Sequence, residues 1–349
     1  MLPDKLQSGL VSIIVPCYNV ERFIERFFNS LAEQTYKNLE VILVNDGATD
    51  QTGDLIQKAL PQLRAEGYDV QVINQDNLGL AGAINTGLKH FTGEFLTWPD
   101  PDDWLTTDSI EQRVKHLNAH PEVGLLRSNA ALYIDSEGEF EGAALPSDTK
   151  PHLSDKLFKE LLFLRTFFHP ICHMARSEFF LNSVGRSIFH QPRSSQNLQM
   201  LLPLVESYPV LITGEIFGNY TIRSDSRSRR AKSSQDLIDR MRMLKENTLQ
   251  TIPKLKHDQN ELRSLTHEFY CRNRLAPIAF EGGHPDLVYQ YLSETKVPRP
   301  IQYLARLLAI FRHKFVPMNQ DVAEAIQSPN FLARLFRKLT YFNPNHVKI

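Results

Sequence analysis

The sequence GEFLTWPDPDDWL, residues 93–105, leads an apolar run into a cluster of carboxylates. Asp100, Asp102 and Asp103 lie within four residues, and charges of one sign at that spacing repel one another, so the cluster does not serve stability. Carboxylates placed where a buried strand ends are typical oxygen ligands of Mg²⁺ or Mn²⁺. The alternative interpretation is a solvated acidic turn closed by proline. The rest of the chain has to distinguish the two.

The composition is that of an ordinary globular protein, with 42% hydrophobic and 23% charged residues among 349. This length allows two domains, or one large domain with an appendage. The net charge of −1 gives no indication of nucleic-acid binding. Cys17, Cys172 and Cys271 are far apart and lack metal-ligand spacing, which favours a reducing compartment. The sequence shows no signal pattern and no run of about 18 apolar residues, so we expect a cytoplasmic protein.

Short β-branched runs alternate with amphipathic segments over the first hundred residues. The runs predict strands at 11–15, 41–44, 69–73 and 95–98, and the segments predict helices at 23–31, 50–63 and 83–89, the first with Asn19 as its N-cap. This alternation predicts an α/β fold with a mainly parallel sheet covered by helices on both faces. Ligands bind at the carboxyl ends of such strands, where three polar clusters fall, at 16–19, 45–46 and 100–103.

Four motifs support a family resemblance: VSIIVPCYN (11–19), LVNDGATD (43–50), NLGLAGAINTG (77–87) and DPDD (100–103). In order and spacing they resemble the GT-A glycosyltransferases of family 2 over about the first 110 residues, and a weaker match continues to about residue 230. The resemblance implies a GT-A, Rossmann-like domain over 1–225. Its nucleotide-sugar half would cover about 1–110 and its acceptor half about 111–225. A helical C-terminal region would follow at 233–349.

The resemblance also implies a function. The expected reaction moves a hexosyl group, with inversion, from a nucleotide diphosphate, UDP-sugar favoured, to a glycan or lipid-linked acceptor in bacterial surface polysaccharide synthesis. A Mn²⁺ or Mg²⁺ ion held by Asp102, with Asp100 and Asp103, would neutralise the leaving diphosphate. Asp102 and Asp103 are thus the expected catalytic carboxylates. A nucleotidyltransferase is disfavoured because no glycine-rich, basic loop follows the first strand.

The same resemblance implies a donor pocket in which Asp46 accepts the imino N–H of a uracil-like base. The other expected donor-binding residues come from the strand ends, the third motif and the second half of the domain: Pro16, Tyr18, Asn19, Asn77, Gly79, Asn85, Asp100 and Arg223.

Three positions depart from the family pattern. Ile84 stands where an arginine is usual, and Gln196-Asn197 stand where an acidic pair supplies the catalytic base, although an amide cannot take a proton from an attacking hydroxyl. Asp225 replaces a histidine. The base is therefore unassigned, with His190, Glu206 and Asp225 as candidates. The alternative function is a non-catalytic donor-binding or scaffolding subunit of a glycan-assembly complex.

The second half offers two further features. Residues 163–173 are rich in aromatic side chains and contain His169 and His173, but Pro170 argues against a helical metal site, and we expect Phe163, Phe167 and Phe168 to pack in the core. Residues 223–232 are rich in serine and arginine, which fits either a solvated linker or a loop that closes over a diphosphate.

Beyond residue 235 the pattern is helical. From 297 to 349, eight Lys or Arg residues stand against two acidic ones. Residues 331–342 form a basic amphipathic helix, a pattern typical of peripheral contact with the inner face of a membrane. The alternative is a helix that packs on the sheet domain or on a second copy of the chain.

Overall fold

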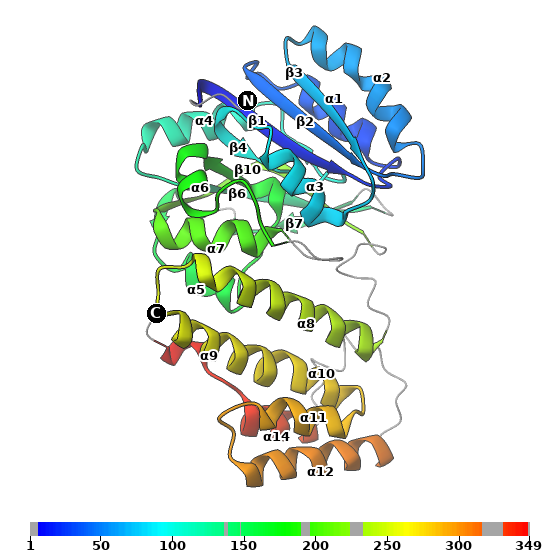
Figure 1. Ribbon diagram of the computed structural model, residues 1–349, viewed down its shortest axis with the longest axis vertical. Helices are drawn as coiled ribbons and strands as arrows, with labels where there is room; N and C mark the ends of the chain where they lie inside the picture. Colours follow the sequence, from blue (N-terminus) through cyan, green and yellow to red (C-terminus); the bar gives the residue numbers. More distant parts are fainter. Residues whose placement is uncertain are drawn as a thin grey trace. The chain divides into compact units, whose positions relative to one another are not determined.

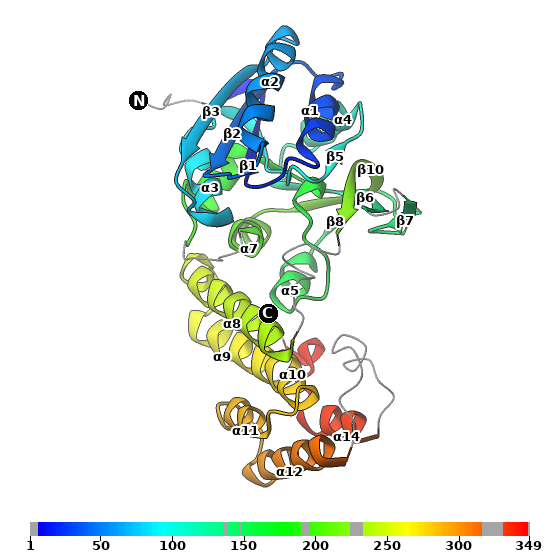
Figure 2. The same ribbon diagram turned by 90° about the vertical axis from the view of Figure 1, so that its right-hand side faces the viewer.

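The computed structural model describes residues 6–135, 139–146, 148–189, 196–223, 233–315 and 331–347. Its chain divides into two compact units, Met1–Arg223 and Ser224–Ile349. Figures 1 and 2 show the strands within the first unit and the helices of the second. The exact domain boundaries, 1–225 and 233–349, stay a prediction.

The first four strands are parallel neighbours in the order β3-β2-β1-β4. Their bounds are Gln7–Cys17 (β1), Leu39–Asp46 (β2), Asp69–Gln75 (β3) and Gly93–Thr97 (β4). The helices between them are α1 (Ile24–Ala32), α2 (Thr52–Ala65) and α3 (Gly79–Leu88). These seven elements confirm the strands and helices predicted from the sequence.

Alternate residues of β1 serve opposite faces of the sheet. Val11, Ile13 and Val15 belong to one apolar core with α1, α2 and α4 (Ser109–Ala119). Ile14 faces the other side, where α3 packs so closely that a Cβ on Gly87 would lie 2.3 Å from its Cγ2 atom. Helices therefore cover both faces, as the alternating pattern predicted.

The sheet continues through strands of mixed direction, β9-β6-β10-β5, beyond β4. These are β5 (Trp104–Leu105), β6 (Leu125–Ile134), β9 (His173–Arg176) and β10 (Val210–Ile222), with β7 (Glu139–Ala143) on β6 and β8 (His152–Ser154) on β10. The strands β6 and β10 are parallel, whereas β9 is antiparallel to both β4 and β6. The α/β class is confirmed, with a parallel first half and a mixed second half.

Three short helices accompany this half, α5 (Leu157–Leu162), α6 (Ser177–Ser183) and α7 (Asn197–Ser207). Phe163 is fully buried, as predicted, whereas Phe167 and Phe168 are only partly buried, and Phe167 packs against the core. His169 stacks on Tyr220 with ring centroids 3.8 Å apart, and His173 stacks on Trp98. The two histidines thus pack on different rings, and they flank a 3-10 turn at Pro170–Cys172 instead of sharing an α-helix.

The second unit contains only helices among its described residues. They are α8 (Ser234–Thr251), α9 (Gln259–Tyr270), the π-helical turn η3 (Cys271–Leu275), α10 (Ala276–Glu281), α11 (Pro285–Ser293), α12 (Arg299–Phe315) and α14 (Phe331–Thr340), with short 3-10 turns at Ile252–Lys254 and Pro344–His346. The helical C-terminal region is thereby confirmed. In the part of the chain that the structure describes, no helix is both long and apolar enough to cross a membrane.

The amphipathic helix α14 packs with its apolar side inward. Ala333 and Phe336 are each 1% exposed and belong to the core of the helical unit. The Phe336 ring stacks on Phe280 with centroids 4.4 Å apart. The apolar face therefore packs on the helical unit itself, a surface that the sequence analysis did not name.

We predict that Gly87→Ala destabilises the first unit by about 1–3 kcal/mol, because the new methyl would displace the buried, β-branched Ile14. Gly53→Ala is the matched control: it also lies in a helix, but its Cβ would be 3.4 Å from the Asn45 amide, an ordinary contact. The control should be neutral or stabilising by up to about 1 kcal/mol. Urea unfolding of both variants measures the difference, and equal stabilities would contradict the close approach.

Candidate active site

The polar clusters predicted from the sequence follow strands that end at one edge of the sheet. Cys17 of β1 pairs with Asn45 of β2, and Asp46 at the end of β2 pairs with Gln75 of β3. On the other side, Ile13 of β1 pairs with Thr97, the last residue of β4. Because these four strands are parallel, the segments after them leave the sheet on the same side.

Asp103 is the enclosed member of the aspartate cluster. Its carboxylate is buried, and its Oδ1 accepts a hydrogen bond of 2.8 Å from the Thr221 backbone N–H of β10. Its Oδ2 has no hydrogen-bond partner among the described residues. Burial, followed by the charges of Asp102 and Asp100, raises the pKa of this carboxyl well above its usual value. Asp103 therefore acts as a tether between the turn after β4 and β10.

Asp102 and Asp100 are more accessible. The Asp102 side chain is 23% exposed and its Oδ2 forms an ion pair of 2.9 Å with Nη1 of Arg223, whose guanidinium also lies over the Phe23 ring. Asp100 is half-buried. The structure thus brings together Asp100, Asp102 and Arg223, which the sequence assigned to one site, and Asp102 already faces a positive charge.

Arg26 of α1 is a site residue that sequence reasoning missed. Its Nη2 donates to the backbone oxygen of Asp102 and to the Thr221 hydroxyl, each at 2.9 Å, and its guanidinium lies 3.8 Å from the centroid of the Trp104 ring. Those hydrogen-bond partners are 76 and 195 residues away along the chain. No local signal could have identified Arg26, because its role depends on the tertiary fold.

Asp46 organises the neighbouring turn from the inside. It is 2% exposed, and its Oδ1 accepts hydrogen bonds from the Gln75 side chain and the Leu78 backbone N–H at 2.7 and 2.8 Å. The next residue, Gly47, has φ +65, and a Cβ there would lie 2.8 Å from the Asn77 nitrogen. Asp46 and Gly47 therefore fix the exposed turn that begins at Asn77 and leads into α3.

The loop after β1 presents Tyr18, which is 47% exposed, next to the buried Pro16. Asn19 has φ +50, a conformation that asparagine tolerates, and its Oδ1 accepts a 2.9 Å hydrogen bond from the Thr49 N–H. The prediction that Asn19 caps the following helix is wrong: α1 begins at Ile24, and Phe23 precedes it without a side-chain cap. Asn19 instead links the loops after β1 and β2.

Asn85 has both ends of its amide engaged. Its Nδ2 donates to the Ile188 oxygen at 3.0 Å and its Oδ1 accepts from the Ile188 N–H at 2.8 Å. The preceding residue, Ile84, is fully buried in α3, where the family pattern has an arginine. Gly79 has φ +75 and begins the same helix. Asn85 therefore holds the backbone of the second half, a role different from direct contact with a donor.

Gln196 and Asn197 stand at the amino end of α7. Gln196 is 1% exposed and both polar atoms of its amide lack partners among the described residues, as does Oδ1 of Asn197. Of the candidate bases, Glu206 lies ten residues further along, which is about 15 Å on an α-helix. His190 and Asp225 lie outside the described residues. No carboxylate of α7 thus lies at the base position in the described part of the chain.

A parallel first half, a mixed second half and aspartates following β4 define the architecture of a GT-A glycosyltransferase domain. Residues 12–179 match the family described as glycosyl transferase family 2. Within Streptococcus pneumoniae, the glycosyltransferase GlyA is 35% identical over 135 residues, which are 39% of this chain and 19% of that protein. The uncharacterized glycosyltransferase EpsJ of Bacillus subtilis is 43% identical over 103 residues, 30% of this chain and 29% of EpsJ.

Among solved structures, the crystal structure of S. aureus TarS 1–349 in complex with UDP-GlcNAc shares the fold, with a TM-score of 0.60 and 17% identity over 95% of this chain and 93% of that one. The matched segments cover less than a third of the length of the two curated relatives named above. Residues 12–179, which match the family model, form a glycosyltransferase family 2 domain.

The raised pKa of Asp103 predicts a pH dependence of stability. A carboxyl whose pKa is higher in the folded state contributes stability that is full below its unfolded pKa and is lost as the pH rises through the folded value. Asp103→Asn keeps an acceptor for the Thr221 N–H and removes the buried charge. We therefore expect the variant to gain stability relative to the wild type as the pH rises above about 4.

Thermal unfolding with a chelator present, from pH 4 to 8, measures this difference. Asp108→Asn, an exposed aspartate at the start of α4, is the control and should show no such trend. A constant difference between Asp103→Asn and wild type across this range would contradict the enclosed, uncompensated state of the carboxyl.

Proposed function

We propose that this chain is an inverting glycosyltransferase that moves a sugar from a nucleotide diphosphate to a glycan or lipid-linked acceptor in bacterial surface polysaccharide synthesis. The observation that carries the proposal is the convergence of Asp102, Asp100 and Arg223 beside the strand ends of a family 2 domain. In this reaction the acceptor hydroxyl attacks the anomeric carbon opposite the diphosphate, the bond to the diphosphate breaks, and the hydroxyl proton passes to a base.

A divalent ion, Mn²⁺ or Mg²⁺, fits the aspartate cluster in part. Asp102 and Asp100 would hold it, because their carboxylates are partly exposed, and Asp102 would exchange its ion pair with Arg223 for the metal. The bound ion would supply charge neutralisation for the departing diphosphate. Asp103 is enclosed and would position the turn instead. Arg223, now paired with Asp102, would turn its guanidinium toward a phosphate, whose geometry it matches well.

The donor residues divide into two groups by their accessibility. Tyr18 and Asn77 are exposed and would contact the nucleotide directly. Asp46 and Asn85 use their side chains inside the protein and would shape the pocket. Our first choice of donor is a UDP-sugar, because TarS, which shares the fold, was crystallised with UDP and with UDP-GlcNAc.

A second candidate function is a non-catalytic donor-binding or scaffolding subunit. It is favoured by the buried amides of Gln196 and Asn197 at the position where the family places its acidic pair. A donor site needs only the strand-edge residues, whereas transfer also needs a group that accepts a proton.

We propose that the basic side of α14 contacts the cytoplasmic face of the membrane. Its apolar side is occupied by the helical core, but Arg334 and Lys338 are exposed. Such residues each contribute about 1 kcal/mol next to an anionic membrane. This contact would bring the domain to a lipid-linked acceptor.

A donor that binds only the folded state raises the free energy of unfolding by mass action, by about 2.7 kcal/mol at a hundredfold excess over Kd. The temperature midpoint of unfolding rises as a consequence. We expect the largest shift with a UDP-sugar plus Mn²⁺, among UDP-, GDP-, dTDP- and CMP-sugars tested with and without the metal. Asp102→Asn should abolish the metal-dependent part. Asp108→Asn, an exposed aspartate in the same stretch, is the matched control and should retain it.

No shift with any nucleotide sugar would contradict both functions, since each requires donor binding. A shift that is independent of metal and unchanged in Asp102→Asn would contradict the metal assignment alone.

The double variant Gln196→Glu, Asn197→Asp separates the two functions. If the amides replaced a lost base, the variant should transfer sugar about 10²- to 10⁴-fold faster than the wild type, the usual contribution of a general base. Radiolabelled sugar transfer measures the rate, and the donor-dependent unfolding shift confirms that the variant is folded. Asn182→Asp, an exposed position on α6, controls for the added charge. An active wild type with no gain in the variant would place the base elsewhere.

A further inference from the structure

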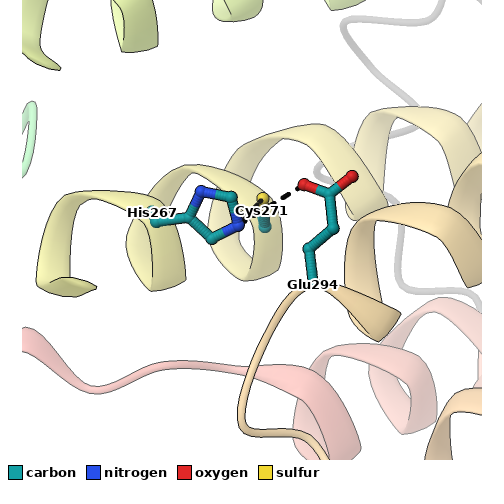
Figure 3. A group of neighbouring side chains, drawn as sticks. All are labelled: His267, Cys271 and Glu294. Carbon is teal, nitrogen blue, oxygen red and sulfur yellow. Dashed lines mark hydrogen bonds and ion pairs between the residues drawn. The ribbon is translucent and has the colours of Figure 1, made fainter. Parts of the chain in front are cut away.

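Three potential metal ligands meet in the helical unit. His267 of α9, Cys271 at the start of η3 and Glu294 after α11 each offer one ligand atom, and these atoms all lie within 4.8 Å of one another. Figure 3 shows the three side chains converging, two from one continuous helix and the third from the end of another. His267 and Cys271 are four residues apart, a spacing that places both on one helix face.

The distances fit a tetrahedral site. The His267 Nε2 atom lies 3.6 Å from the Cys271 Sγ and 3.4 Å from the Glu294 Oε2. A Zn²⁺ ion has bonds of about 2.3 Å to sulfur and about 2.0–2.2 Å to nitrogen and oxygen; tetrahedral angles then separate nitrogen from sulfur by about 3.6 Å and nitrogen from oxygen by about 3.4 Å. Two edges of the tetrahedron are therefore already formed, and the Glu294 side chain, 40% exposed, is free to adjust the third.

The surroundings leave room for a fourth ligand. A cavity of about 310 Å³ adjoins the cluster and is lined in part by His267, Glu294, Lys245 and Tyr291. Zinc sites with three protein ligands keep an open fourth position for water, whereas purely structural sites are closed by a fourth protein ligand. The three ligands here would join α9 to the end of α11 and leave the fourth position open to the cavity.

The charges around the thiol are compatible with metal binding. Burial raises the pKa of Cys271 to about 11, so an incoming metal displaces a proton, while the Lys245 ammonium, 3.5 Å from the sulfur, opposes that rise. Burial also lowers the pKa of His267, which keeps its imidazole neutral and able to donate a lone pair.

We propose that His267, Cys271 and Glu294 form a zinc site with water in the fourth position. A thiolate, an imidazole and a carboxylate together favour Zn²⁺ over the hard Mg²⁺ and Mn²⁺ ions that suit the aspartates of the sheet domain. The site would stabilise the helical unit and is independent of sugar transfer. The competing interpretation is a trio of side chains held by hydrogen bonds alone.

Titration of the full-length chain with Co²⁺ tests the proposal, in an Asp102→Asn background that removes the other candidate metal site. We expect one Co²⁺ per chain, with tetrahedral visible absorption and a near-ultraviolet thiolate-to-metal band, both displaced by Zn²⁺. Cys271→Ser should lose the thiolate band. Glu294→Gln should weaken Co²⁺ binding by at least about 10- to 100-fold.

Glu246→Gln is the matched control, because Glu246 lines the same cavity but is not part of the trio. It should bind Co²⁺ as the parent does. Circular dichroism establishes that each variant is folded, and His267→Gln replaces Cys271→Ser if the latter does not fold. Absence of a thiolate band in the folded parent, or its persistence in Cys271→Ser, would overturn the proposal.

Discussion

The hydrogen bond from the Thr221 N–H to the buried Asp103 carboxylate joins the two halves of the glycosyltransferase domain. It ties the turn after β4, which belongs to the nucleotide half, to β10 of the second half. Because Arg223 follows Thr221 by two residues, the same tether places its guanidinium against Asp102. Arg26 contacts both sides of the junction, at the Asp102 oxygen and the Thr221 hydroxyl. The enclosed Asp103 thus fixes the turn that carries the accessible Asp102. The Arg223 charge beside Asp102 offsets part of the repulsion within the cluster.

The sequence predicted the parallel half well, because buried strands and amphipathic helices leave periodic apolar patterns that depend on local spacing alone. It also predicted the edge at which Asp102 and Asp46 lie, since chain direction fixes where parallel strands end. It did not distinguish enclosed from accessible side chains. Whether Asp103 meets Thr221, or Asn85 meets Ile188, depends on contacts between residues more than a hundred positions apart. Neither leaves a local signal.

The helical unit shows a related limit of pattern analysis. An apolar stripe with basic flanks describes a helix on a membrane and a helix on a protein core equally well. In α14 the apolar stripe packs on Phe280 and the core of the helical unit. The periodicity therefore predicted which face of the helix is buried, but not the surface that buries it. The three cysteines are too far apart in the sequence to indicate a metal site among themselves. The spacing that matters is the four residues between His267 and Cys271. Metal sites with mixed ligands are visible only when every ligand type is considered together.

Donor binding and proton transfer make different demands on the same domain. Binding needs charge and shape at the strand edge, where we propose that Asp102, Arg223 and the Asn77 turn contact the donor. Transfer also needs a proton acceptor near the bound sugar, and the amides at the start of α7 cannot act as one. Glu206 stands about 15 Å along α7 from Gln196. Because the acceptor hydroxyl attacks opposite the diphosphate, proximity to Asp102 does not identify the base, and Glu206 does not stand where the family places its acidic pair.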